Sequence, residues 1–267
     1  MIEERKQKEI EYYDKKAKDL LEKKLDPSKD FEGFSPLELE SYRFCYFLLR
    51  KFSKDKVVLD YGCGNGIHTV SLAKMGAKKV IGIDLSEKSL KIAKKRIAQE
   101  NLRGKVELFK MDCEKTDFSD DYFDIIFDGG TFSSLDLRLA FLELARILKK
   151  DGKLIGIETF GHNPIANLKR KINKILNKRT DWAVAHIFTL KDLKEAEKYF
   201  EKIEVYYFHP ISFLVFPFLN LPTGKFLLKL LERIDRFLLF FSFFRKFSFK
   251  VVFVFSQPKS NYAKKSI

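Results

Sequence analysis

The sequence has few cysteines, no long apolar run and no apolar leader. Its three cysteines, Cys45, Cys63 and Cys113, are odd in number, and they form neither a C-x-x-C pair nor a zinc pattern. A reduced cytoplasmic setting without a metal site therefore fits. No run reaches the roughly eighteen apolar residues that a membrane-spanning helix needs. The first residues, MIEERKQKEI, are charged, so we expect no secretory signal at this end.

Acidic residues are outnumbered, with 37 Asp and Glu against 51 Lys and Arg, and the net charge is +14. Such a charge allows two interpretations, a phosphate-bearing or anionic-membrane partner and a lysine-rich solvated surface. The solvated surface is favoured, since acids and bases are mixed in most segments. The 267 residues, of which 45% are hydrophobic, suit one large domain, or one domain with additions, around a sizeable core.

From Lys56 onward, short apolar segments alternate with helical patterns. This alternation predicts an α/β fold with a parallel sheet covered by helices on both faces. Strands are expected at 56–61, 79–84, 105–110, 123–127, 153–159, 202–208 and 248–256, with Asp151-Gly152 as the turn before the fifth. Helices are expected at 3–25, from Ser35-Pro36 to Phe52, and at 66–75, 87–101, 134–149, 163–179 and 190–199.

These patterns divide the chain into five parts. We predict an N-terminal helical cover (1–55), an α/β domain (56–210), an apolar and basic helical insertion (211–247), a final strand (248–257) and a disordered tail (258–267). We see no internal repeat.

The stretch KVVLDYGCGNGIHTV predicts a strand, a glycine-rich turn and a helix start. Asp60 closes the apolar run Val57-Val58-Leu59, and Gly62, Gly64 and Gly66 follow at alternate positions. Glycines let the backbone approach a ligand closely, and the helix behind them offers free N–H groups. The G-x-G-x-G spacing differs from the dinucleotide pattern, and no second nucleotide half is apparent, so a dinucleotide is disfavoured.

Asp84 ends the second predicted strand, about twenty residues beyond the glycine turn. An acid at this place can accept hydrogen bonds from both hydroxyls of a ribose. The alternative is an acid that answers a helix dipole, but Ser86 already supplies the cap. Together with the glycine turn, Asp84 indicates a cofactor that contains a nucleoside.

Two further sites follow predicted strands. Asp112, after the third strand, can accept from an exocyclic adenine amine, although a plain loop acid is the alternative. After the fourth strand, Asp128-Gly129-Gly130 lets a ligand lie against backbone. All four sites lie at carboxyl ends of strands, the edge along which open α/β sheets bind ligands.

Four stretches in order carry a family resemblance, namely VVLDYGCGNG, VIGIDLSEKSLKIAKKR, MDCEKTDFSDDYFDIIFDGG and LARILKKDGKLIGIETF. They resemble the class I S-adenosylmethionine-dependent methyltransferases over residues 37–160. The resemblance implies a Rossmann-like, doubly wound sheet of seven strands, mostly parallel with a reversed last strand. It also implies S-adenosyl-L-methionine as cofactor.

By the same resemblance, roles pass to particular residues. Asp60, Gly62, Gly64 and Gly66 would hold the methionine end of the cofactor. The ribose would bind Asp84, while Leu85 would pack on the adenine. Asp112 and Cys113 would contact the base, and Asp128, Gly129 and Gly130 would floor the site. EYYDKKAKDL is similar to the covering helix of many members, which makes Tyr13 the residue that closes over the cofactor. The alternative for Tyr13 is a packing role.

The acceptor side resembles the small-molecule (type 11, UbiE-like) group. There, DGGTFSSLD has Ser133 and Ser134 where histidines are frequent, and this departure puts a histidine-based proton transfer in doubt. The resemblance would place Ser133, Glu158, His162, Asn163 and His186 in the acceptor pocket. Candidate catalytic residues are Glu158, His162 and His186, and for both histidines the alternative is a structural role. The sequence identifies neither the accepting atom nor a general base.

Other functions stay open. The net charge and the basic run 169–179 prompt nucleic-acid methylation, but the slot after the fourth strand reads Asp128-Gly129-Gly130-Thr131. Base methyltransferases carry an Asn/Asp-Pro-Pro-Tyr/Phe tetrad there, and no RNA-binding module is evident, so we expect no nucleic acid. Nothing favours a protein substrate. The departure at Ser133 and Ser134 also allows an accessory protein that binds the cofactor without methyl transfer.

Residues 211–247 interleave apolar runs, FLVFPFLNLP and FLLFFSFFRKF, with Lys and Arg. Three interpretations fit: a lid on the pocket, a surface that docks on a membrane or admits a lipid-like acceptor, and an oligomer interface. We therefore expect a cytoplasmic methyltransferase that acts on a small-molecule or lipid-linked acceptor, with peripheral membrane contact through 211–247 as one option.

Overall fold

The computed structural model describes residues 3–22, 36–175 and 180–259. The expected end of the first helix, its successor's start at Ser35 and nearly all of the tail lie outside the described residues.

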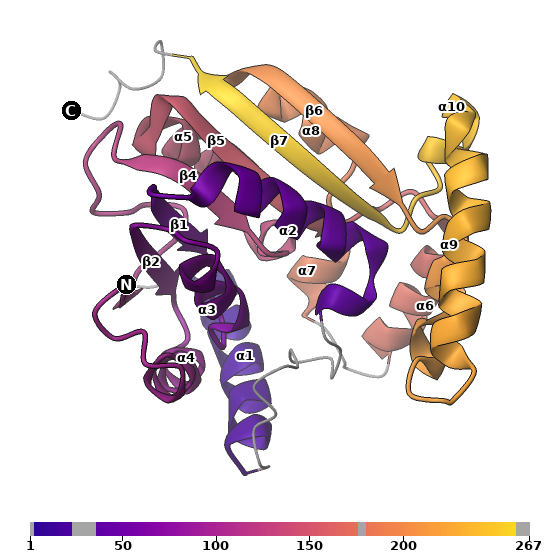
Figure 1. Ribbon diagram of the computed structural model, residues 1–267, viewed down its shortest axis with the longest axis horizontal. Coiled ribbons are helices and arrows are strands. Elements are labelled where there is room, and N and C mark those ends of the chain that lie inside the picture. The colour runs from indigo at the N-terminus through magenta and orange to yellow at the C-terminus, as the bar shows by residue number, and fades with distance from the viewer. Residues whose placement is uncertain (1–2, 23–35, 176–179, 260–267) are drawn as a thin grey trace.

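A single sheet of seven strands organises the molecule (Figure 1). The strands are β1 (Val57–Tyr61), β2 (Lys79–Asp84), β3 (Val106–Lys110), β4 (Phe123–Asp128), β5 (Leu148–Thr159), β6 (Phe200–Phe208) and β7 (Lys250–Pro258). Their order is β3-β2-β1-β4-β5-β7-β6. Neighbours are parallel, except that β7 runs antiparallel to both β5 and β6. This confirms the predicted Rossmann-like sheet with its reversed last strand.

Helices cover both faces of the sheet. Their bounds are α1 (Glu4–Glu22), α2 (Glu40–Ser53), α3 (Ile67–Lys74), α4 (Glu87–Gln99), α5 (Leu137–Ile147), α6 (Pro164–Ile175), α7 (Asp181–Ala185), α8 (Leu190–Ala196), α9 (Gly224–Phe240) and α10 (Ser242–Arg245), with short 3-10 turns η1 (Pro36–Glu38), η2 (Phe132–Ser134) and η3 (Ser212–Phe218). One apolar core lies under α2, α3 and α4, and the other lies under α5 and α8. Burial on both faces explains the nearly continuous apolar strands.

Helix starts follow the sequence signals. The Ser86 hydroxyl accepts a hydrogen bond from the Ser89 backbone N–H at 3.0 Å and caps α4. Thr189 and Asp192 form a reciprocal capping box at the start of α8, which satisfies N–H groups that no helical carbonyl can reach.

The start of β5 differs from the prediction. The strand begins at Leu148, which pairs with Phe123, and it runs through the expected turn at Asp151-Gly152. The register shifts between Phe123 and Ile125. This irregularity lets the strand bend while it stays paired, so a turn signal in the sequence became a bend inside a strand.

Residues 211–247 form η3, α9 and α10, which lie at one end of the sheet (Figure 1, orange to yellow). A small apolar cluster of Leu39, Val215, Leu219 and Leu228 joins this segment to the rest. Among the described residues, no helix is both long and apolar enough to cross a membrane.

Candidate functional site

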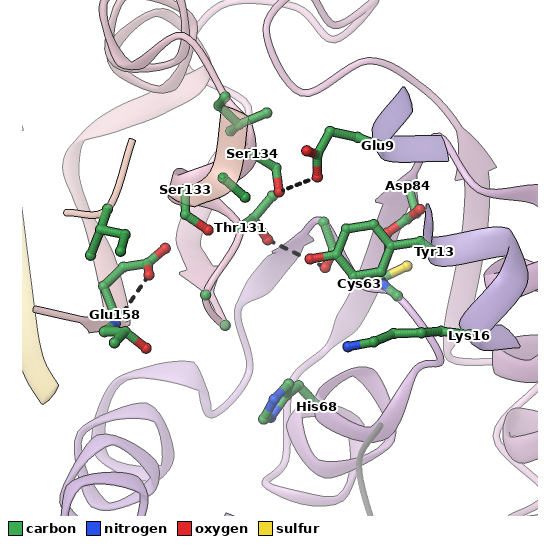
Figure 2. Close-up of a pocket in the computed structure, with 18 of the residues that line it drawn as sticks. Glu9, Tyr13, Lys16, Cys63, His68, Asp84, Thr131, Ser133, Ser134 and Glu158 are labelled. Carbon is green, nitrogen blue, oxygen red and sulfur yellow. Dashed lines mark hydrogen bonds between the residues drawn. The ribbon is translucent and has the colours of Figure 1, made fainter. Parts of the chain in front are cut away.

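A cavity of about 510 Å³ lies where the carboxyl ends of β1 to β5 meet α1, α6, α7 and η3. Figure 2 shows side chains from several of these elements converging on it. Of the residues predicted for the cofactor or acceptor, those that line it are Tyr13, Gly62, Gly64, Asp84, Leu85, Asp112, Cys113, Gly129, Gly130, Ser133 and Glu158.

The glycine turn presents backbone to this cavity. Gly62, Gly64 and Gly66 all have positive φ, at 72°, 50° and 78°, a region that residues with a Cβ rarely adopt. A Cβ on Gly62 would lie 2.3 Å from Thr131 Oγ1. Gly66 is not among the lining residues; a Cβ there would lie 2.7 Å from Ala93 Cβ of α4. Gly66 therefore serves helix packing, while Gly62 and Gly64 face the cavity.

Asp84 joins the glycine turn to the end of β2. Its Oδ2 accepts from the Gly64 backbone N–H at 2.9 Å, and its Oδ1 accepts from the Ser86 N–H at 2.8 Å. Burial raises its pKa, and the two backbone hydrogen bonds oppose that rise. An ionised carboxylate has about four lone-pair positions, so it retains room to accept from ligand hydroxyls.

Asn65 is a residue that the sequence interpretation missed. It lies within the glycine turn, lines the cavity and is 2% exposed. Its Nδ2 has no hydrogen-bond partner among the described residues. Because a buried amide rarely goes without a partner, Asn65 offers a donor to a ligand. The glycine pattern marks this turn in the sequence, but the pattern assigns no role to the residues between the glycines.

Two predicted cofactor acids, Asp60 and Asp128, lie behind the cavity wall. Asp60 accepts a hydrogen bond from Thr69 Oγ1 at 2.5 Å, and burial raises its pKa to about 7. Asp128 accepts from the Thr131 backbone N–H at 3.0 Å. Burial and the neighbouring Glu158 carboxylate raise the pKa of Asp128 well above its usual value. Neither carboxylate is among the residues that line the cavity, and both lie beneath its floor.

Helix α1 closes the base side. Lys6 Nζ donates to Asp112 Oδ2 at 2.6 Å, so this predicted partner of the adenine amine is already engaged. Arg5 pairs with the buried Glu114 at 2.8 Å. Tyr13 reaches from α1 into the cavity (Figure 2). These ion pairs hold α1 over the glycine turn. No local sequence pattern predicted these contacts.

The acceptor side combines polar and apolar groups. Glu158 Oε1 accepts from the Phe132 backbone N–H at 2.7 Å. His68 is half-buried and packs against Tyr46, whose hydroxyl lies 2.8 Å from Nδ1. Burial lowers the pKa of His68 to about 4, so this histidine is neutral near pH 7. Phe216, Pro217 and other apolar groups complete this side.

Three residues predicted for the acceptor pocket do not line the cavity. His162 Nε2 accepts from the Leu190 backbone N–H at 3.0 Å. Asn163 caps α6 by accepting from two N–H groups and holds the carbonyls of Pro210 and Phe247. His186 is exposed and stacks on Trp182, with ring centroids 3.7 Å apart. Each of these side chains satisfies local backbone or aromatic contacts instead.

Arg170 is a lining residue that the prediction did not single out. It belongs to the basic run 169–179 and donates to the Phe160 carbonyl at 3.0 Å. Among the described residues, no cluster of three or more His, Cys, Asp or Glu could hold a metal ion.

Comparisons with known proteins agree with this geometry. Residues 59–156 match the family described as a methyltransferase domain. The demethylmenaquinone methyltransferase of Lactobacillus johnsonii is 34% identical over 131 residues, which cover 48% of this chain and 54% of that protein. The ribosomal protein L11 methyltransferase of Ruminiclostridium cellulolyticum is 40% identical over 82 residues, 30% of this chain and 24% of that protein. The chain thus spans about half or less of these relatives.

Solved structures share the fold at low identity. The geranyl diphosphate C-methyltransferase of Streptomyces coelicolor has a TM-score of 0.57 at 16% identity, covering 80% of this chain and 78% of that one. A phosphoethanolamine N-methyltransferase of Haemonchus contortus has a TM-score of 0.59 at 19% identity, covering 83% and 54%. Both were solved with S-adenosylhomocysteine. Residues 59–156 thus carry a methyltransferase domain, and the seven-stranded sheet has the fold of the class I S-adenosylmethionine-dependent methyltransferases.

Proposed function

We propose that this chain transfers the methyl group of S-adenosyl-L-methionine to a small-molecule or lipid-linked acceptor. The observation that carries the proposal is a single cavity in which the glycine turn and Asp84 face an acceptor side with an apolar wall. Its volume of about 510 Å³ lies within the range of small-molecule sites. Relatives named for demethylmenaquinone and geranyl diphosphate support an acceptor of this kind.

The lining residues fit the cofactor. Asn65 Nδ2 and the glycine-turn backbone would hold its carboxylate, Asp84 would accept from the ribose, and Leu85 and Cys113 would flank the base. When bound, the cofactor supplies an electrophilic methyl group on a positively charged sulfur. The chain's task is to align an acceptor with that methyl group, to exclude water and, for a protonated nucleophile, to take a proton.

Glu158 is the candidate for the proton. Of the three residues proposed from the sequence for catalysis, it is the one that lines the cavity. Its neighbour Asp128 has a raised pKa, because it is buried beside Glu158. Two close carboxyl groups do not both ionise readily, so the pair favours a single negative charge. A carboxylate there can orient an acceptor's O–H or N–H group, or deprotonate it.

The cofactor assignment is tested by calorimetry with S-adenosyl-L-methionine. Asp84→Ala removes the proposed ribose contacts and releases the Gly64 N–H, and we expect binding to weaken roughly 100-fold, since two hydrogen bonds to a charged group are lost. Asp151→Ala, at an exposed acid in β5, is the matched control and should bind like the original chain. Absent binding by the original chain, or equal binding by Asp84→Ala, would contradict the assignment.

Methyl transfer is tested by assaying S-adenosylhomocysteine with fractionated metabolites and lipids. Glu158→Gln should lower turnover while cofactor affinity stays within about threefold, because Glu158 acts on the acceptor side. A chain that binds the cofactor and makes no S-adenosylhomocysteine with any fraction would instead be an accessory protein, the second candidate that Ser133 and Ser134 keep open.

A further inference from the structure

Helix α9 turns its acids inward. Glu232 and Asp235 are 4% and 2% exposed. Glu232 accepts from the Glu40 backbone N–H and from Arg43, both at 2.8 Å. Asp235 accepts from the backbone N–H groups of Ile211 and Ser212 at 3.0 and 3.1 Å. The side of α9 that carries Glu232 and Asp235 is therefore the side that packs against the rest of the molecule.

Large apolar side chains of α9 point away from the molecule. Phe226 is 73% exposed, Phe237 is 67% and Phe240 is 80%. Phe226, Leu230, Ile234 and Phe237 follow the spacing i, i+4, i+8 and i+11, which places them on one face of a helix. A surface helix normally buries such a face, and a contiguous exposed one marks an interaction site.

The elements before and after α9 extend this exposed apolar surface. We call the exposed apolar residues of 211–247 the outer face: Leu214, Phe218, Leu221, Phe226, Leu227, Leu230, Ile234, Phe237, Phe240, Phe241 and Phe243. They come from η3, α9, α10 and the links between them. At one end of the sheet, α9 and α10 form the margin of the molecule (Figure 1).

Within residues 211–247, every exposed charge is basic. Residues 211–247 hold six exposed bases, namely Lys225, Lys229, Arg233, Arg236, Arg245 and Lys246. The only two acids in this segment are Glu232 and Asp235, and both are buried. Lys225 pairs with Glu38 at 2.9 Å and Arg236 pairs with Glu40 at 3.3 Å. Lys229, Arg233, Arg245 and Lys246 have no ion-pair partner among the described residues and remain available to an anionic partner.

We propose that the outer face docks on an anionic phospholipid membrane, with α9 lying in the plane of the surface. An amphipathic helix of this kind sinks its apolar side about 5–10 Å into the lipid boundary. Its bases then meet lipid phosphates. A second copy of the chain is a poorer occupant, because its own exposed bases Lys229, Arg233, Arg245 and Lys246 would approach those of the first.

The outer face also adjoins the cavity wall. In η3, Phe216 and Pro217 line the cavity, while Leu214 and Phe218 belong to the outer face. Docking would therefore bring one wall of the cavity to the lipid surface, from which a lipid-linked acceptor could enter. This last step rests on the proposed function, whereas the docking itself does not.

The test is co-sedimentation of the full chain with vesicles at low salt. Vesicles of equal parts phosphatidylcholine and phosphatidylglycerol should bind the chain, and pure phosphatidylcholine should bind it at least tenfold more weakly. Phe226→Ser/Phe237→Ser/Phe240→Ser should reduce binding at least tenfold. The matched control, Phe47→Ser/Phe109→Ser/Leu139→Ser, changes exposed apolar residues elsewhere and should not reduce it.

Charge is tested separately. Lys229→Glu/Arg233→Glu should reduce vesicle binding about tenfold or more, while Lys94→Glu/Lys95→Glu on α4 makes the same change in net charge and should have a much smaller effect. Circular dichroism shows that each variant is folded, which keeps the docking test separate from the cofactor assignment.

Three results would overturn the docking proposal. The first is no sedimentation with anionic vesicles, and the second is equal sedimentation of the outer-face and control variants. The third is light scattering that shows a dimer which the outer-face variant dissociates, because a second copy would then cover this face.

Discussion

Gly62 shows most sharply how one residue shapes the cofactor side. Its φ of 72° and the 2.3 Å from a built Cβ to Thr131 Oγ1 leave no room for a side chain. Thr131 cannot move freely, because its hydroxyl donates to the Tyr61 carbonyl at 3.0 Å. We expect Gly62→Ala to lower the free energy of unfolding by about 2 kcal/mol, from the left-handed backbone and the clash. Cofactor affinity should fall at least tenfold.

The control is Gly104→Ala, because a Cβ at position 104 would have no neighbouring atom within 4 Å. Denaturant unfolding and calorimetry should show that variant within about 0.5 kcal/mol of the original chain. Equal behaviour of the two variants would mean that the turn tolerates a side chain and is not shaped for close approach.

Individual residues were predictable from sequence only where backbone position decides their place. Asp84 ends β2 and Leu85 follows it directly, so the edge of the sheet places both at the cavity. His162 and Asn163 also follow a strand, yet each satisfies nearby backbone groups. A polar side chain here can meet either a ligand in the cavity or a nearby backbone group. The tertiary positions of α6 and α8 decide between the two, and a sequence pattern does not contain those positions.

Glu114 decides whether α1 stays closed. Its side chain is 1% exposed and accepts from Arg5 at 2.8 Å, from Lys6 at 2.7 Å and from the Asp136 backbone N–H at 2.7 Å. Burial is the largest influence and raises its pKa, but the hydrogen bonds from Arg5 and Lys6 prevail and lower it. Glu114→Gln would leave Arg5 and Lys6 without this charge, and we expect a loss of about 3 kcal/mol.

Hydrogen exchange measures this effect directly. Amides of α1 should exchange faster in Glu114→Gln, and S-adenosyl-L-methionine should bind several-fold more weakly, because the cover is less often in place. Glu4→Gln removes an exposed pair with Lys8 within α1 and should change neither quantity. Unchanged exchange in Glu114→Gln would show that apolar contacts alone hold the helix.

Secondary structure was the most predictable level. Most strands lie within two residues of their predicted bounds, because apolar runs between turn residues specify a buried strand. The early start of β5 was missed, since pairing with β4 overrode the local signal of Asp151-Gly152. The outward orientation of the apolar face of α9 could not be predicted from the sequence either. Its periodicity predicts a helix face but does not say which face meets the molecule.

At the scale of the molecule, the sheet separates two tasks. The ends of β1 to β4 carry the predicted cofactor residues, and α1 covers that side. The ends of β5 and α6 and the insertion after β6 form the opposite side of the cavity. The family resemblance covers the cofactor side, so the residues on that side could be predicted from the sequence. The second side depends on an insertion that the pattern does not describe.

Two histidines, the half-buried His68 and the buried His209, tie the stability of the whole molecule to pH. Burial lowers the pKa of His68 to about 4 and that of His209 to about 3. Below about pH 6.5 the unfolded chain binds a proton at each histidine and the folded chain does not, so stability falls as pH decreases. Each histidine contributes at most about 1.4 kcal/mol per pH unit. Asp60, with its pKa raised to about 7, acts in the opposite direction between about pH 7 and 4.

A single variant isolates one of these histidines. His209 lies between the hydroxyls of Ser41 and Ser212 and has a φ of 60°, a backbone region that asparagine tolerates. His209→Asn should lower stability at pH 7, because the ring's contacts are lost. It should also flatten the acid slope by about 1.4 kcal/mol per pH unit between pH 6 and 4.

The measurement is urea unfolding at several pH values. The control is His186→Asn, whose ring is exposed in the folded chain and should leave the slope as it was. If His209→Asn retained the full slope, His209 would be able to take up a proton in the folded state. The hydrogen bonds by which His209 connects α2 to residues 211–247 would then have to open to water. These bonds would not hold the outer face rigidly.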